Sequence, residues 1–267
     1  MELLLAIIAI VLALTGGDSS RAAPDDPGTV TISLDRPGGG PRPDDPKIYG
    51  ARNPDRPLVI LDAGHGGRDP EATSPIDGSR EKDVTLAVAR AIRDELVASG
   101  RVRVAMTRED DRFLVLQDRY QIARRLGADL FISVHADAAP ANDGARGATI
   151  YTLSEVASDK EAALLAQQQN SADRLAGAPL ADDAGVNRIL IGEGSAFFPF
   201  RPDYHRFASL IVLKAPDVPS LLFETGYLTN SVDSTYIHSP EGQKQIALGM
   251  RRAIEAHFAR RLLERRR

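Results

Sequence analysis

The sequence predicts a single α/β domain in which helices flank a mostly parallel, twisted central sheet. From Leu58 onward, short apolar runs alternate with segments of helical period, which is typical of that class. The 267 residues are enough to bury a sizeable core, and they contain no internal repeat.

Six strands and four helices account for this alternation. The expected strands comprise residues 58–62, 101–108, 128–135, 147–153, 208–215 and 220–226. The expected helices comprise residues 83–100, 116–127, 158–177 and the segment after Ser239. The stretch at 178–207 contains many glycine and proline residues and is expected to be irregular.

Capping residues mark where these helices are expected to begin. Asp83 is expected to cap the first helix, and Ser158 followed by Glu161 has the capping-box pattern for the third. Ser239 precedes Pro240, which suits the first turn of the last helix. The apolar stripe of that helix falls at Ile246, Met250, Ala253, Ile254 and His257.

The ends of the chain differ in composition from the rest. Residues 3–14 form an apolar run with the length of a signal-peptide core, so we expect residues 1–23 to direct export, with a cleaved signal favoured over an uncleaved anchor. Residues 24–56 are rich in proline, glycine and aspartate and are expected to be a tether, with a candidate edge strand at 29–34. The folded domain is expected to comprise residues 57–262, and residues 263–267 form a basic tail.

Composition excludes several functions. The net charge of −4 and a pI near 5.8 argue against a nucleic-acid-binding protein, which needs a basic face to neutralise phosphates. The chain has no cysteine, which excludes disulfides and thiolate metal sites. Membrane contact is expected only for the N-terminal segment.

Side chains that can bind metal or transfer protons stand where strands are expected to end. His65 follows the first strand, His135 ends the third, and Glu224 lies near the end of the last. Glu81 stands just before the first helix, in a connection between strand and helix. Ligands bind beyond the carboxyl ends of the strands in an open parallel sheet, so these four side chains are expected to converge at one edge.

Two imidazoles and one carboxylate are the ligands of an open, catalytic zinc site. A second carboxylate beside them would act as the general base for a metal-bound water. Gly64, Gly66 and Gly67 would supply the positive backbone dihedrals that turn a ligand inward and leave space above it.

Each residue also has a structural interpretation. A histidine among glycines can be a simple turn residue, and a glycine-rich loop before a helix can bind phosphate. The phosphate loop is disfavoured because the chain has no GxxxxGK[ST] motif. His135 could be a core histidine and Glu224 a cap or ion-pair partner, so the expectation rests on their joint occurrence at strand ends.

The sequence resembles the zinc-dependent N-acetylmuramoyl-L-alanine amidases, including the periplasmic cell-division type, which cleave bacterial peptidoglycan. The similarity covers roughly residues 57–258 in family order. The matching stretches are "VILDAGHGGRDP", "REKDVTLAVA", "MTRED", "GADLFISVHADAAP", "GATIYTLSE" and "VLKAPDVPSLLFETGYLTN".

The resemblance implies that His65, Glu81 and His135 bind Zn²⁺ and that Glu224 is the catalytic acid/base. Hydrolysis of the amide between the lactyl group of N-acetylmuramic acid and L-alanine would then serve septal splitting or cell-wall turnover. An exported, periplasmic enzyme is expected, because peptidoglycan lies outside the cytoplasmic membrane. A division activator of the LytM type is a candidate partner, and the resemblance identifies no substrate-binding residues.

Three features depart from the family pattern. Glu71 stands where the family usually has glycine, and Asp137 puts an extra carboxylate near the metal. The segment at 155–207 resembles a shortened regulatory segment, so residues 178–206 either retain a reduced inhibitory element or leave the enzyme impaired.

The alternative function is therefore an impaired homologue that binds peptidoglycan or a partner protein. A zinc-dependent polysaccharide deacetylase is disfavoured, because no second histidine follows His65 or His135 at helical spacing.

Overall fold

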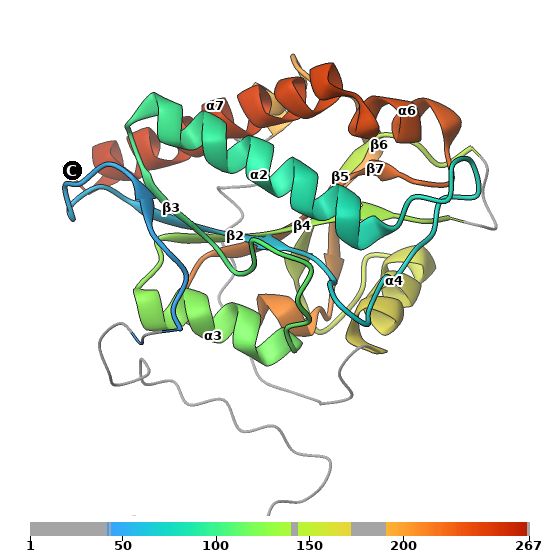
Figure 1. The fold of residues 1–267 in the computed structure, drawn as a ribbon, viewed down its shortest axis with the longest axis horizontal. Coiled ribbons are helices and arrows are strands. Elements are labelled where there is room, and N and C mark those ends of the chain that lie inside the picture. The colour runs from blue at the N-terminus through green and yellow to red at the C-terminus, as the bar shows by residue number, and fades with distance from the viewer. Residues whose placement is uncertain (1–41, 43, 140–143, 172–190, 266–267) are drawn as a thin grey trace, which may run out of the picture.

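A seven-stranded sheet lies between two layers of helices in the computed structural model, which describes residues 42, 44–139, 144–171 and 191–265 (Figure 1). The strands are β1 (Tyr49–Gly50), β2 (Leu58–Ala63), β3 (Arg103–Met106), β4 (Leu130–Asp137), β5 (Ala148–Leu153), β6 (Phe200–Ala208) and β7 (Ser220–Tyr227). The helices are α2 (Glu81–Ser99), α3 (Leu116–Leu126), α4 (Lys160–Ser171), α6 (Ser231–His238), α7 (Pro240–Glu264) and the 3₁₀ helix η1 (Ile211–Leu213). The predicted α/β class with a flanked central sheet is confirmed.

The sheet is mostly parallel and has the strand order β1-β3-β2-β4-β7-β5-β6. Strands β3, β2, β4 and β7 are mutually parallel, so their carboxyl ends share one edge of the sheet. Strand β5 is antiparallel to β7 and parallel to β6, and β1 is antiparallel to β3. The parallel centre therefore provides the edge at which the sequence places its polar residues.

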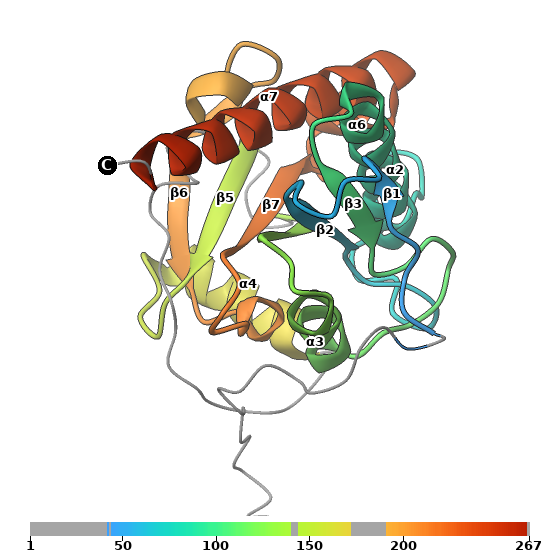
Figure 2. The same cartoon turned by 90° about the vertical axis from the view of Figure 1, so that its left-hand side faces the viewer.

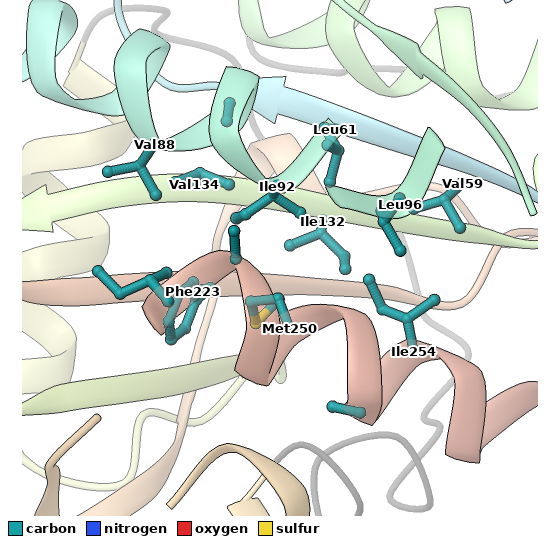
Figure 3. Packing of buried hydrophobic residues seen from close by; sticks show 14 of the residues in the cluster. Val59, Leu61, Val88, Ile92, Leu96, Ile132, Val134, Phe223, Met250 and Ile254 are labelled. Carbon is teal, nitrogen blue, oxygen red and sulfur yellow. The ribbon is translucent and has the colours of Figure 1, made fainter. Parts of the chain in front are cut away.

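Each face of the sheet has its own apolar core. Helices α2 and α7 cover one face, and α3, α4 and η1 cover the other (Figures 1 and 2). Figure 3 shows side chains from α2, β2, β4, β7 and α7 meeting in the first core, among them Ile92, Ile132 and Met250. The predicted apolar stripe of α7 is buried along its whole length.

The segment at 200–215 contradicts the expected strand at 208–215. Strand β6 begins at Phe200, within the stretch expected to be irregular, and ends at Ala208. The apolar residues that follow form η1, whose side chains pack into the core between α3 and the sheet. A short apolar run is buried equally well in a strand or in a helical turn, so periodicity alone does not distinguish them.

Two of the three predicted helix caps are wrong. Helix α2 begins at Glu81, and Asp83 lies in its first turn, where its carboxylate accepts a hydrogen bond from Arg80 Nε at 3.0 Å. Ser158 does not cap α4: its hydroxyl accepts a hydrogen bond from the Phe207 backbone N–H and so links the start of α4 to β6. Ser239 does cap α7, because its Oγ accepts from Gly242 N at 2.9 Å.

Parts of the chain ends lie outside the described residues, including the segments expected to be an export signal (1–23) and an edge strand (29–34). Strand β1 comes from the segment expected to be a tether and pairs with the edge of β3. None of the helices in the described ranges is both long and apolar enough to cross a bilayer.

Candidate metal centre and active site

Three potential metal ligands converge at the carboxyl edge of the parallel strands. His65 follows β2, Glu81 is the first residue of α2, and His135 lies near the end of β4. His65 Nε2 lies 3.2 Å from Glu81 Oε1 and 3.1 Å from His135 Nδ1, and Glu81 Oε1 lies 3.2 Å from His135 Nδ1. The three atoms form a nearly equilateral triangle, and all three residues are buried.

The triangle fits zinc. Ligand atoms about 2.0–2.1 Å from a tetrahedral zinc ion lie about 3.3 Å from one another. The observed separations of 3.1–3.2 Å are close to that value. Two imidazole nitrogens and one carboxylate oxygen also leave a fourth coordination position open, as catalytic zinc sites require.

The loop after β2 brings the two imidazoles together. A Cβ on Gly64 would lie 2.4 Å from Cε1 of His135, so a side chain at this position would displace the ring. His65 itself has a φ of 60°, a left-handed conformation that directs its ring toward the other donors. The predicted positive φ occurs at Gly66 and Gly67, whereas Gly64 is required for close approach.

Two buried arginines hold the backbone of this loop. Arg119 on α3 donates to the His65 carbonyl at 2.7 Å and to Asp62 Oδ1 at 2.9 Å. Arg108 donates to the Gly64 carbonyl at 2.7 Å. Because a guanidinium presents several donors in a fixed plane, each arginine can satisfy several loop carbonyls at once.

Hydrogen bonds behind the ligands orient both imidazoles. His65 Nδ1 lies 3.0 Å from Asp69 Oδ2, on the side of the ring away from the other donors. His135 Nε2 lies 3.1 Å from Ser133 Oγ, which in turn donates to Asp62 Oδ2 at 2.7 Å. Each ring can therefore donate its distal N–H outward and keep a lone pair for a metal, as metal-ligating histidines do.

The electrostatics of the triangle favour one bound positive charge. Burial lowers the pKa of His65, but the carboxylates of Glu81 and Asp69 outweigh it and raise that pKa to about 10. Burial raises the pKa of Glu81, but the two histidines outweigh it and hold the pKa below its usual range. Burial lowers the pKa of His135, so this ring stays neutral. Without metal, the site thus holds a proton on His65, and a metal ion must displace that proton.

Glu224 lies beside the triangle on β7. In the sheet it is paired with His135 on β4, and its side chain is fully buried. Neither of its carboxylate oxygens has a hydrogen-bond partner among the described residues. Burial, and then the negative charges of Asp137 and Glu81, raise the pKa of Glu224 well above its usual value. A buried carboxyl group with an elevated pKa can take up and release a proton near neutral pH.

The two positions that depart from the family pattern both lie close to the site. Burial, and then Glu81, raise the pKa of Asp137 to about 7. Glu71 has a φ of 47°, and its Oε2 lies 4.0 Å from His65 Nδ1. The described residues also include a looser donor group, formed by His65, Asp69 and Glu71.

Sequence reasoning missed the residues that support the ligands. Asp62 and Ser133 are polar residues inside buried strands, which is a signal that could have identified them. Arg108 and Arg119 gave no such signal, because an arginine on a short helix or after a strand is usually exposed. Another histidine, His205, lies on β6, where it contacts Thr152.

The sequence profile of one protein family, described as N-acetylmuramoyl-L-alanine amidase, matches residues 59–256. The chain is 34% identical over 237 residues to the N-acetylmuramoyl-L-alanine amidase AmiC of Neisseria meningitidis, with 80% of this chain and 56% of that protein covered. It is 34% identical over 222 residues to AmiA of Escherichia coli, with 75% and 76% covered. The chain therefore spans little more than half the length of the AmiC relative.

Solved structures show the same fold. The structure of the N-acetylmuramoyl-L-alanine amidase AmiC2 of Nostoc punctiforme superimposes with a TM-score of 0.58 at 28% sequence identity. The match covers 76% of this chain and 97% of that structure. The family match at residues 59–256 includes all four residues of the candidate site.

Proposed function

Because the chain belongs to the N-acetylmuramoyl-L-alanine amidase family, we propose that it is a zinc hydrolase that releases stem peptides from peptidoglycan. The bond cut is the amide between the lactyl group of N-acetylmuramic acid and L-alanine. The observation that carries this proposal is the triangle of three donor atoms beside an unpartnered buried carboxylate.

His65, Glu81 and His135 would hold the zinc ion. When bound, zinc supplies a Lewis acid for the scissile carbonyl and lowers the pKa of a bound water toward about 7. Asp69 and the Ser133 hydroxyl keep the two imidazoles oriented by accepting their distal N–H groups. This support makes the donor set rigid before substrate arrives.

Glu224 would move the proton. Its carboxylate accepts a proton from the water that attacks the lactyl carbonyl, and then donates that proton to the departing alanine nitrogen. Among the described residues no hydrogen bond engages the Glu224 carboxylate, so it is available for this transfer. The elevated pKa makes the protonated form accessible, which the second step requires.

The substrate sets the cellular location. Peptidoglycan lies outside the cytoplasmic membrane, so residues 1–23 would direct export to the periplasm and residues 24–56 would form a tether. Residues 57–262 would be the catalytic domain, with a shortened regulatory segment at 155–207 and an activator of the LytM type. The enzyme would serve septal splitting or cell-wall turnover.

The test combines metal analysis with product analysis. Zinc-loaded protein is incubated with purified peptidoglycan fragments, and released peptides are identified by mass spectrometry. Wild type should release peptides that begin with L-alanine, whereas Glu224→Gln should bind zinc and release none. His65→Ala should lose both zinc and activity, because it removes a ligand.

His205→Ala is the matched control, because it removes a histidine of β6 that contacts Thr152 and is not part of the donor triangle. This variant should keep zinc and activity. Wild type that binds zinc but releases no peptide, with activator present, would contradict the amidase function and favour the impaired homologue.

A further inference from the structure

Thr149 lies directly opposite Glu224 in the sheet. Strands β5 and β7 are antiparallel, and their register pairs these two residues. Residues paired in this way project from the same face, with Cβ atoms about 4.5–5.5 Å apart. The same face carries Tyr151 and Leu222, which pack into the core beneath α3 and α4. The Thr149 and Glu224 side chains are therefore neighbours on this face.

Both side chains are buried, and their side-chain oxygens lack hydrogen bonds in the described part of the chain. Thr149 and Glu224 are each 0% exposed. Within the described residues, neither Thr149 Oγ1 nor either carboxylate oxygen of Glu224 forms a hydrogen bond. Buried polar groups in folded proteins are almost always satisfied, and leaving one unsatisfied is costly. A hydroxyl donor beside a carboxylate acceptor indicates that the two groups pair when the site is assembled.

The other side chains near Glu224 do not offer such a donor. The carboxylates of Asp137, Glu81 and Glu71 repel it, and the Asp137 backbone offsets this only in part by lowering the pKa of Glu224. The Tyr151 hydroxyl accepts a hydrogen bond from Arg206, which draws it toward β6. His135, paired with Glu224 from the opposite side, has both ring nitrogens engaged.

We propose that Thr149 is a positioning residue for Glu224. Its hydroxyl donates to one carboxylate oxygen in the assembled site and directs the other oxygen toward the attacking water. Catalytic hydrogen bonds are often long or poorly aligned in the empty enzyme and tighten when ligands bind. The catalytic part of this inference rests on the amidase function proposed above, whereas the hydrogen bond itself does not.

The bond is tested by a double-mutant cycle of unfolding. Thr149→Val keeps the shape of the side chain and removes the hydroxyl, and Glu224→Met removes the acceptor. Urea midpoints are measured for wild type, both single variants and the double variant, with and without zinc chloride. Thr149→Val should lower the midpoint in the wild-type background and leave it unchanged beside Glu224→Met. Additive changes in both conditions would overturn the inference, whether or not the protein proves to be an amidase.

The positioning role is tested by kinetics on peptidoglycan fragments. Thr149→Val should lower kcat about tenfold to hundredfold, as expected for a lost hydrogen bond to a charged group, and leave KM unchanged. Thr149→Ser restores the hydroxyl and should restore kcat. An unchanged kcat in Thr149→Val, or an equal loss in Thr149→Ser, would overturn the role.

Thr152→Val serves as the matched control. Thr152 is on the same strand, and its hydroxyl contacts His205 at 3.0 Å rather than facing Glu224. This substitution should leave kcat unchanged and should not couple to Glu224→Met. A coupling as large as that of Thr149 would show a general effect of β5 and contradict the specific pairing.

Discussion

Glu71 adopts a backbone conformation that favours glycine, with a φ of 47°. A left-handed φ costs a residue with a Cβ roughly 1–2 kcal/mol. The Glu71 backbone N–H donates to Asp69 Oδ1 at 3.2 Å. This hydrogen bond fixes the turn next to Asp69, the residue that contacts His65. The family's usual glycine would remove this strain.

Two substitutions isolate that strain. We expect Glu71→Gly to be more stable than Glu71→Ala by about 1 kcal/mol, because both remove the carboxylate and only alanine keeps the Cβ. At an ordinary position alanine would be the more stable of the two. Urea unfolding of both variants measures the difference, and a more stable Glu71→Ala would show that the backbone here is relaxed.

Asp62 forms the most buried ion pair of the described structure with Arg119, at 2.9 Å. Burial raises the pKa of Asp62, but Arg119 and the hydroxyls of Thr107 and Ser133 outweigh it and lower that pKa below 3.8. Because the folded-state pKa of Asp62 lies below its unfolded-state pKa, the carboxylate stabilises the fold fully at pH values above the unfolded-state pKa. This stabilisation is lost as the pH falls through the folded-state pKa.

We therefore expect Asp62→Asn to destabilise the protein by about 3–5 kcal/mol near neutral pH, because it leaves Arg119 buried without its counter-charge. The loss should shrink as the pH falls below 3.8, where the unfolded chain is protonated, and vanish below the lowered folded-state pKa, where folded wild type also loses the carboxylate. Asp94→Asn removes an exposed ion-pair partner and should change stability little. Unfolding across acidic pH tests this, and a loss that is independent of pH would exclude the ionic explanation.

Among the residues of the site, the sequence indicated His65, His135 and Glu224 because each stands at the end of an apolar run. It did not indicate the contact between Asp62 and Ser133. These two residues meet because the register of β2 and β4 pairs them, and register depends on contacts far apart in the chain.

Helices α2 and α7 stabilise the sheet from one face, and α2 also supplies Glu81. Ile92 of α2 is 0% exposed and packs against the sheet and Met250 of α7 (Figure 3). We expect Ile92→Ala to cost about 2–5 kcal/mol, because it leaves a cavity between the two helices and the sheet.

Val232→Ala is the control for this substitution. Val232 lies on α6 with 55% of its surface exposed, so its truncation should change stability by less than about 0.5 kcal/mol. Urea unfolding measures both variants. Similar losses for the two would contradict the assignment of the core to the α2–α7 layer.

The strongly periodic helix α7 was predicted well, whereas η1, β6 and α6 were not. The stripe of α7 and its Ser239 cap have local signals that tertiary contacts reinforce. The 3₁₀ helix η1 and strand β6 lack such signals, because their conformations depend on packing against α3 and on pairing with β5. Helix α6, capped by Asn230, was also missed, since its eight residues are too few for a clear period.

At the scale of the molecule, the fold follows from the order of its elements. Parallel strands joined by helices bring residues from distant parts of the sequence to one edge, where the ligand triangle and Glu224 lie together. The class and the location of the site were therefore predictable without knowledge of the strand order. The antiparallel placement of β5 beside β7 was not, yet it sets Thr149 against Glu224.

In the proposed reaction, water activated beside Glu224 attacks the lactyl carbonyl. The most direct test is digestion of peptidoglycan by the zinc-loaded protein in heavy-oxygen water, followed by mass spectrometry of both products. We expect one heavy oxygen in the lactyl carboxylate of the glycan product and none in the peptide that begins with L-alanine. Heavy oxygen in the peptide, or cleavage at another bond, would contradict it.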